Sequence, residues 1–178
     1  MRKSVSPPAV LVRRSPLGAS LGILQVGALR MRCALGRAAT SVFKREGDGA
    51  TPVATMAVLS AYARSGRLPG LKTGLAVAYT RQDSGWCDSP THPAYNRPVR
   101  FPFSAGAETL QRDDRLYDFV VVLDWNVRSR GRHKGSAIFL HVAREGYRPT
   151  EGCVAVSPAD MRRLAPLLRK GSRLTVLR

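Results

Sequence analysis

Long apolar runs are missing from this chain of 178 residues. No segment approaches the length of about 20 apolar residues that a membrane-spanning helix needs, so we expect no membrane span. Cysteine is also scarce, and Cys33, Cys87 and Cys153 form neither a Cys-x-x-Cys pair nor a cluster with histidines. Because a zinc site needs such a cluster, we expect no metal, and nothing in the sequence indicates another cofactor.

The three thiols cannot all pair with one another, so at least one of them is free. Cys33 and Cys87 allow two interpretations. Either they are small buried apolar side chains, which we favour, or they form a disulfide in an oxidising compartment.

Acidic residues are few: 12 Asp and Glu stand against 29 Lys and Arg, which gives a formal net charge of +17. The basic residues are spread over the whole chain rather than gathered in blocks. An arginine-rich proteome, an anionic polymer as substrate, or nucleic-acid binding would each explain this charge. Because no RNA- or DNA-binding motif accompanies it, we expect no nucleic-acid partner.

The N-terminus lacks the pattern of a standard signal peptide. Arg2 and Lys3 give it a basic start, but prolines and arginines between residues 7 and 14 interrupt any apolar segment, and no small-residue cleavage site follows. Residues 1–20, rich in Ser, Pro and Arg, are predicted to be a disordered basic leader. The hydrophobic content of 44% is ordinary for a globular protein, and residues 21–178 are predicted to form one domain.

Short apolar runs bounded by turn-forming residues predict that strands dominate the fold. The stretch from Ser84 to Phe103, dense in Pro, Trp, Tyr and Asn, is instead predicted to be a long loop. The strands predicted from the pattern are residues 22–26, 29–35, 75–80, 118–123, 135–142, 154–156 and 174–177.

One helix is predicted to begin after Ser157. Ser157 is a favoured N-cap, Pro158 suits the first helical position, and Asp160 can reach back to the cap. Pro166 lacks an N–H, so we expect the helix to kink or restart there before Gly171 ends it.

The stretch from His141 to Cys153 combines an imidazole, a thiol and a glycine-tight turn. A cysteine is nucleophilic only as thiolate, so Cys153 needs a base such as His141. Gly152, just before it, lets backbone N–H groups converge on a developing oxyanion. The combination predicts a cysteine nucleophile. His92 and His133 lie in loop sequence and are predicted to be solvated.

These motifs resemble the catalytic signature of the YkuD-type L,D-transpeptidase family. In that family a strand-end His precedes a Ser/Thr-x-Gly-Cys turn, which Thr150-Glu151-Gly152-Cys153-Val154 matches. The upstream segment 44–56, which contains Thr51-Pro52, looks like the family's Thr-Pro-x-Gly-x-aromatic motif. Residues 86–88, 95–98 and 117–126 look similar to a proteobacterial branch of the family, so the resemblance spans about residues 28–178.

The fold that the resemblance implies is mainly β: a YkuD-like β-sandwich with one C-terminal helix. Segment Thr55–Ala63 has the Ala, Met and Leu content of a helix. The resemblance places a strand there, and we predict a strand.

The resemblance also implies roles for the residues of the catalytic turn. Cys153 would be the nucleophile and His141 the general base, with a backbone carbonyl orienting the imidazole. Backbone N–H groups of Gly152 and Cys153 would hold the oxyanion, and Thr150 and Glu151 would contact the substrate.

Peptidoglycan stem peptides in the periplasm are the implied substrate. Attack by Cys153 would release a terminal D-amino acid, and an amine of a second stem peptide would then form a 3→3 crosslink. Two alternatives remain open: an L,D-carboxypeptidase that uses water as acceptor, or a non-catalytic basic protein that binds polyanions on the same fold. We expect a monomer. Without a standard signal peptide, unconventional export, a misassigned start codon and a cytoplasmic role also stay open.

Glu151 is the departure from the family pattern with a direct electrostatic consequence, since His or Arg is usual at that position. A carboxylate beside Cys153 disfavours the thiolate. Glu151 is therefore expected to lower the reactivity of the resting thiol and to attract the ammonium group of the acceptor. The alternative is that Glu151 points to solvent or pairs with Arg144 or Arg148.

Overall fold

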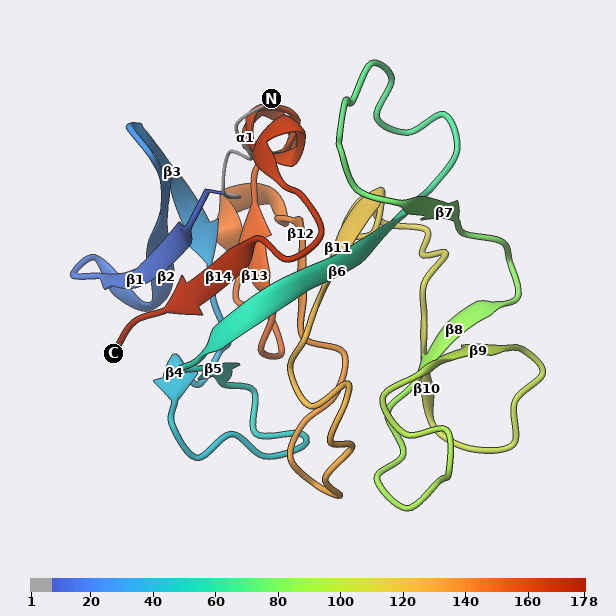
Figure 1. The fold of residues 1–178 in the computed structure, drawn as a ribbon. Helices are drawn as coiled ribbons and strands as arrows, with labels where there is room; N and C mark the ends of the chain where they lie inside the picture. The colour runs from blue at the N-terminus through green and yellow to red at the C-terminus, as the bar shows by residue number, and fades with distance from the viewer. Residues whose placement is uncertain (1–7) are drawn as a thin grey trace, which may run out of the picture.

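The computed structural model describes residues 8–178, which form one large sheet, two small sheets and a short C-terminal helix (Figure 1). The mainly β prediction with one C-terminal helix is confirmed. The large sheet contains β1 (Val10–Ser15), β2 (Gly18–Val26), β3 (Leu29–Ala34), β6 (Thr55–Ala63), β7 (Val77–Tyr79), β11 (Phe119–Leu123), β12 (Phe139–Val142), β13 (Val154–Val156) and β14 (Arg173–Val176). The small sheets contain β8 (Ser84–Cys87), β9 (Pro98–Arg100) and β10 (Ala107–Thr109), and β4 (Thr40–Ser41) with β5 (Thr51–Pro52).

The large sheet closes on itself through β6. Its strand order is β11-β12-β13-β3-β2-β1-β14-β6-β7, and β6 pairs with β14 along its first residues and with β11 along its later ones. Figure 1 shows β6 crossing the molecule beside β14 toward β7. The strand prediction for Thr55–Ala63 is confirmed, because burial of Met56, Val58 and Ala61 on the sheet outweighs local helix propensity.

The predicted disordered leader is wrong from residue 10 onward. Strand β1 pairs antiparallel with β2 and parallel with β14, and both Val10 and Val12 are fully buried. A hydrogen-bonded partner on each side and the burial of alternating apolar side chains outweigh the Pro- and Arg-rich composition. The first seven residues of the predicted leader lie outside the described residues.

The predicted loop from Ser84 to Phe103 is wrong in part, because it contains β8 and β9. These strands and β10 form a three-stranded antiparallel sheet. Trp86 on β8 is buried, and its indole N–H donates to Asn96 Oδ1 at 2.9 Å. This contact between side chains of the same segment orders a region whose composition is typical of loops.

The strand that contains the proposed base His141 is shorter than predicted, since β12 spans Phe139–Val142 only. Gly135 and Ala137 have positive φ angles of 94° and 51°, which regular extended backbone does not contain. The Ala137 N–H donates to Asn96 Oδ1 at 3.1 Å, so a side chain from the connection between β8 and β9 holds this irregular backbone.

The helix prediction is confirmed by α1 (Pro158–Leu164). Ser157 Oγ accepts the Asp160 N–H at 3.0 Å and donates to Asp160 Oδ2 at 2.9 Å. The α-helix stops before Pro166, as expected for a residue without an N–H. The 3-10 helices are η1 (Glu145–Tyr147) and η2 (Ala165–Leu167). None of the helices within residues 8–178 is long and apolar enough to cross a membrane.

Two clusters of buried apolar side chains occupy the two faces of β11 and β12. The larger one takes residues from both ends of the chain, including β1, β2, β6, α1 and β14. The smaller one contains Trp86, Leu110, Tyr117, Val120, Val122, Phe139 and Cys153. The proposed nucleophile therefore lies on the aromatic face of these strands and not in the main core.

Candidate active site

Cys153 follows a turn that Thr150 closes. Thr150 Oγ1 donates to the Cys153 carbonyl at 2.7 Å and accepts the Gly152 N–H at 3.1 Å. Gly152 has a φ of 136°, and a Cβ atom there would lie 2.8 Å from the Ala50 carbonyl oxygen. Only glycine fits such a position, so the Gly-Cys sequence is a steric requirement of the turn.

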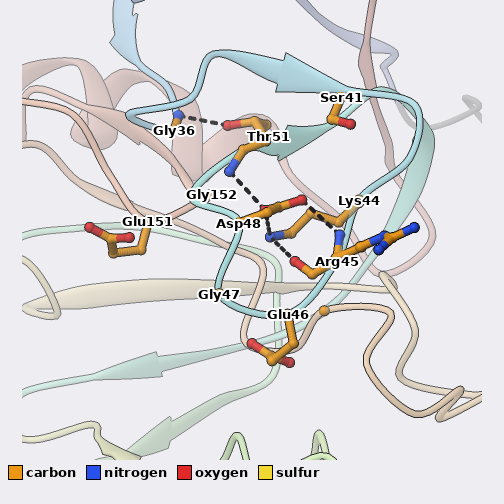
Figure 2. A network of polar contacts seen from close by, with 12 residues as sticks. Gly36, Ser41, Lys44, Arg45, Glu46, Gly47, Asp48, Thr51, Glu151 and Gly152 are labelled. Carbon is orange, nitrogen blue, oxygen red and sulfur yellow. Dashed lines mark hydrogen bonds and ion pairs between the residues drawn. The ribbon is translucent and has the colours of Figure 1, made fainter.

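The upstream Thr51-Pro52 motif supports the same turn. Thr51 is fully buried, and its Oγ1 accepts the Gly36 N–H at 2.8 Å, as Figure 2 shows. The same hydroxyl donates to the Cys153 carbonyl at 3.4 Å. Two motifs that lie far apart in the sequence therefore meet at the backbone of the proposed nucleophile.

The thiol of Cys153 is buried and hydrogen-bonded. Its Sγ donates to the Ala137 carbonyl at 3.2 Å and accepts the Phe139 N–H at 3.4 Å. Burial raises the pKa of Cys153 to about 12, and the Glu108 carboxylate raises it as well. The Phe139 N–H and the charge of Lys44 lower this pKa. The resting side chain is a neutral thiol.

His141 is buried near the end of β12, with only 2% of its surface exposed. Its Nδ1 lies 2.8 Å from the Val142 carbonyl oxygen. A carbonyl only accepts, so Nδ1 carries the proton and Nε2 is the free basic nitrogen. The imidazole packs edge-on against Tyr117, with ring centroids 5.3 Å apart. Burial lowers the pKa of His141 to about 4, so the imidazole is neutral near pH 7.

Cys153 and His141 line one cavity of about 420 Å³. They reach it together because β12 and β13 are parallel neighbours, with His141 opposite Ala155. Thr150 and Glu151 also line this cavity, so the fold collects every side chain that the sequence nominated. Other lining residues are Lys44, Glu46, Asp88, Glu108, Arg112, Tyr117, Ser136, Arg144 and Arg148.

The two residues nominated for substrate contact have other partners in this structure. The Thr150 hydroxyl is engaged within its own turn. The side chain of Glu151 is 78% exposed and forms an ion pair with Arg37, Oε2 to Nε, at 2.8 Å. Of the alternative stated for Glu151, the orientation toward solvent is confirmed, whereas the pairing with Arg144 or Arg148 is wrong because the partner is Arg37.

One of the two backbone donors expected to hold an oxyanion is already occupied. The Gly152 N–H donates to Thr150 Oγ1, whereas the Cys153 N–H has no hydrogen-bond partner among the described residues. The geometry thus leaves a single free backbone donor beside the thiol. A second donor has to come from elsewhere or from opening of the turn.

Several cavity residues were not found by reasoning from the sequence. Glu108 on β10 accepts a hydrogen bond from the Tyr117 hydroxyl, and burial raises the pKa of Glu108. Glu46 accepts a hydrogen bond from the Tyr95 hydroxyl. Both tyrosines lie in segments that resemble the family, so they could have been nominated. Nothing in the sequence around Glu108 points to the site.

The remaining histidines and cysteines lie outside the cavity. His133 is exposed, while His92 is half-buried and its Nδ1 accepts the Ala94 N–H at 3.0 Å. Cys33 and Cys87 are free and buried, which confirms the interpretation as buried thiols. Within residues 8–178, no group of three His, Cys, Asp or Glu side chains is arranged to hold a metal ion.

Residues 24–176 match the model of the YkuD family, the L,D-transpeptidase catalytic domain. Because this match covers most of the chain, the chain belongs to that family. No curated protein matches this chain.

Three solved structures similar to this chain are L,D-transpeptidases. L,D-transpeptidase 1 of Mycobacterium tuberculosis has 14% identity and a TM-score of 0.43, with 96% of this chain and 63% of that chain covered. The enzyme from Mycobacterium smegmatis has 15% identity and a TM-score of 0.43, with 96% and 59% covered. L,D-transpeptidase 3 of Mycobacterium tuberculosis, solved with a faropenem-derived adduct, has 15% identity and a TM-score of 0.42, with 96% and 61% covered. The chain thus spans less than two thirds of each of these proteins.

Proposed function

We propose that this protein catalyses cysteine-dependent acyl transfer on peptidoglycan stem peptides, as an L,D-transpeptidase. The observation that carries the proposal is the joint placement of Cys153 and His141 in one cavity. Cys153 lies on the signature turn of the family to which the chain belongs, and His141 lies on β12. Burial holds both groups neutral at rest, so no thiolate-imidazolium pair is formed in advance. Proton transfer must accompany the attack.

Acylation begins when Cys153 Sγ attacks the carbonyl carbon between an L-centre and a D-centre of the donor stem. The thiol proton passes to Nε2 of His141, the nitrogen that the Val142 carbonyl leaves free. The C–N bond then breaks, and the terminal D-amino acid leaves with the proton from the imidazolium. A thioester remains on Cys153.

Deacylation decides between two outcomes of the same chemistry. An amine of a second stem peptide attacks the thioester and gives its proton to His141. The C–S bond then breaks, the imidazolium returns the proton to Cys153 Sγ, and the new amide is a 3→3 crosslink. Water in the same place would give a trimmed stem, the product of an L,D-carboxypeptidase. Because the proposed substrate is the cell wall, we propose that the protein acts in the periplasm and as a monomer.

A thiol-specific and a product-specific measurement test this proposal together. Incubation with a carbapenem is expected to give an acyl adduct that mass spectrometry maps to Cys153, and the Cys153→Ala variant should form none. The Cys33→Ala and Cys87→Ala variants serve as matched controls and should still be acylated.

Disaccharide-tetrapeptide stems should then yield a crosslinked dimer. Trimmed stems alone would identify a carboxypeptidase. An adduct on Cys33 or Cys87 with Cys153 untouched would contradict the site. Absence of any reaction, together with salt-sensitive binding of polyanions, would favour the non-catalytic alternative.

A further inference from the structure

Lys44 is a buried cation at the edge of the cavity. Its side chain is only 3% exposed, and its ammonium group pairs with Asp48 and donates to the Arg45 carbonyl at 2.8 Å. Figure 2 shows the Lys44 side chain reaching toward Asp48 within the loop that leads to Thr51. Burial of a charge is costly unless it is paired, and Asp48 provides the partner that keeps the Lys44 ammonium charged here.

The loop holds the ion pair rigidly. Asp48 accepts the Arg45 N–H at 2.7 Å through Oδ2 and the Ala50 N–H at 2.9 Å through Oδ1. Burial alone would raise the pKa of Asp48, but the hydrogen bonds from Lys44, Arg45 and Ala50 lower it below its ordinary value. The ammonium is therefore fixed to backbone and is not a mobile surface charge.

The fixed ammonium lies against the catalytic turn. A Cβ atom placed on Gly152 would lie 3.5 Å from Lys44 Nζ, and one placed on Gly135 would lie 3.0 Å from Lys44 Cε. Lys44 lines the same cavity as Cys153. Of the three N–H groups of an ammonium, two are used by Asp48 and the Arg45 carbonyl, and the third has no partner within residues 8–178.

The oxyanion of an acyl-transfer intermediate needs donors at this place. The Gly152 N–H is taken by Thr150 Oγ1, which leaves only the Cys153 N–H. We propose that Lys44 is a further catalytic residue, whose ammonium supplies the second oxyanion donor that Gly152 does not provide. The charge also stabilises the negative charge that develops on Cys153 Sγ as its proton moves to His141. Lys44 transfers no proton in this scheme, and Asp48 is its positioning residue.

This inference rests on the proposed acyl transfer, but one of its tests does not. Replacement of Lys44 by Met removes the charge and would leave Asp48 unpaired, so the double variant Lys44→Met/Asp48→Asn is made beside it. Lys72→Met is the matched control, because Lys72 is exposed and outside the cavity. Lys44→Arg keeps the charge. Melting temperatures and far-UV circular dichroism establish which variants fold.

Two rates are measured for each folded variant: acylation of Cys153 by a carbapenem, and alkylation of Cys153 by iodoacetamide at pH 8. Loss of one oxyanion donor is expected to slow acylation by about 10²-fold. Loss of the charge should slow alkylation by about tenfold, because Lys44 lowers the pKa of Cys153 and its removal reduces the thiolate fraction. Lys44→Arg should recover most of the alkylation rate, and Lys72→Met should behave like the parent.

The outcomes separate this inference from the proposed function. Parental acylation and alkylation rates in a folded double variant would overturn the role of Lys44. If the parent is alkylated at Cys153 but neither acylated nor active on stem peptides, the acyl-transfer proposal fails, and with it the oxyanion role of Lys44. The alkylation rates then still show whether the charge of Lys44 acts on the thiol. The other titratable groups that line the cavity around the thiol include Glu108 from β10, Glu151 from the catalytic turn and His141 from β12.

Discussion

Strand β12 has two faces that serve different purposes. Leu140 and Val142 point into the large core, where they pack among apolar side chains from both ends of the chain. Phe139 lies in the aromatic cluster on the other face, and His141 lines the cavity. The neighbouring strand β11 divides in the same way, with Val121 in the large core and the residues beside it in the aromatic cluster.

The strand pair β11 and β12 thus separates stability from chemistry. Side chains of the core face bury apolar surface and nothing else. The cavity face combines the rings of Tyr117 and Phe139 with a buried imidazole, whose neutral form depends on exclusion of water. Substitutions on the two faces should therefore affect different measurements, even at adjacent positions.

The largest effect on chemistry is expected for His141→Gln. Removal of a general base slows proton transfer by about 10²- to 10⁴-fold, so acylation of Cys153 by a carbapenem should slow by this factor. Glutamine keeps a polar side chain of similar length, and the far-UV circular dichroism spectrum should stay unchanged. A near-parental acylation rate would show that His141 has only a structural role.

The adjacent substitution Leu140→Ala should have the opposite signature. Leu140 is fully buried in the large core, and truncation of such a residue costs about 2 to 5 kcal/mol of unfolding free energy. Urea unfolding measures this loss, with His141→Gln unfolded in parallel. The acylation rate per folded molecule should stay within about threefold of the parent. A tenfold loss of rate with little loss of stability would break the division between the two faces.

The burial of His141 should also make stability depend on pH. Its pKa is about 4 in the folded state against 6.5 for the ordinary side chain. Between these values the unfolded chain binds the extra proton, so the unfolding free energy falls as pH falls from about 6.5 to about 4. The loss approaches about 3 kcal/mol and stops below about pH 4.

Urea unfolding between pH 7 and pH 4 tests this dependence. Other groups titrate in this range too, so the difference between the parent and His141→Gln isolates the contribution of His141. Parallel curves for the two proteins would mean that the imidazole is not held neutral by burial.

Glu151→Gln should give the smallest effect. This carboxylate raises the pKa of Cys153 less than burial and Glu108 do. It is largely exposed and paired with Arg37, so solvent and the guanidinium screen its charge. Iodoacetamide alkylation of Cys153 near pH 7 should speed up by less than about threefold.

Aminolysis of the acyl-enzyme tests the second part of the Glu151 hypothesis. If the carboxylate attracts the acceptor ammonium, Glu151→Gln should slow this step. Equal alkylation rates for Glu151→Gln and the parent would contradict the effect of Glu151 on the thiol, and unchanged aminolysis would contradict its role toward the acceptor.

Local patterns predicted much of the fold. The helix after Ser157 follows from its cap, Pro158 and Pro166, and the core strands follow from short apolar runs between turns. Strand β1 was missed because its order depends on β14, at the other end of the chain. Strand β8 was missed because Trp86 and Asn96 bond within a segment whose composition resembles a loop.

For the candidate site, the turn before Cys153 could be predicted from the sequence. A glycine at a φ of 136° and a threonine hydroxyl that closes the turn are local requirements, so they leave a readable motif around Cys153. His141 could be nominated for the same reason, since a strand end and a short connection bring it back to the thiol.

The surroundings of that turn depend on contacts between distant segments and could not be predicted from local patterns. Lys44 reaches Gly152, and Glu108 influences the thiol, because the closed sheet and the small sheet bring separate loops to one cavity. The neutral states of Cys153 and His141 also depend on the tertiary structure. Burial, which no local pattern specifies, is the largest influence on both of their pKa values.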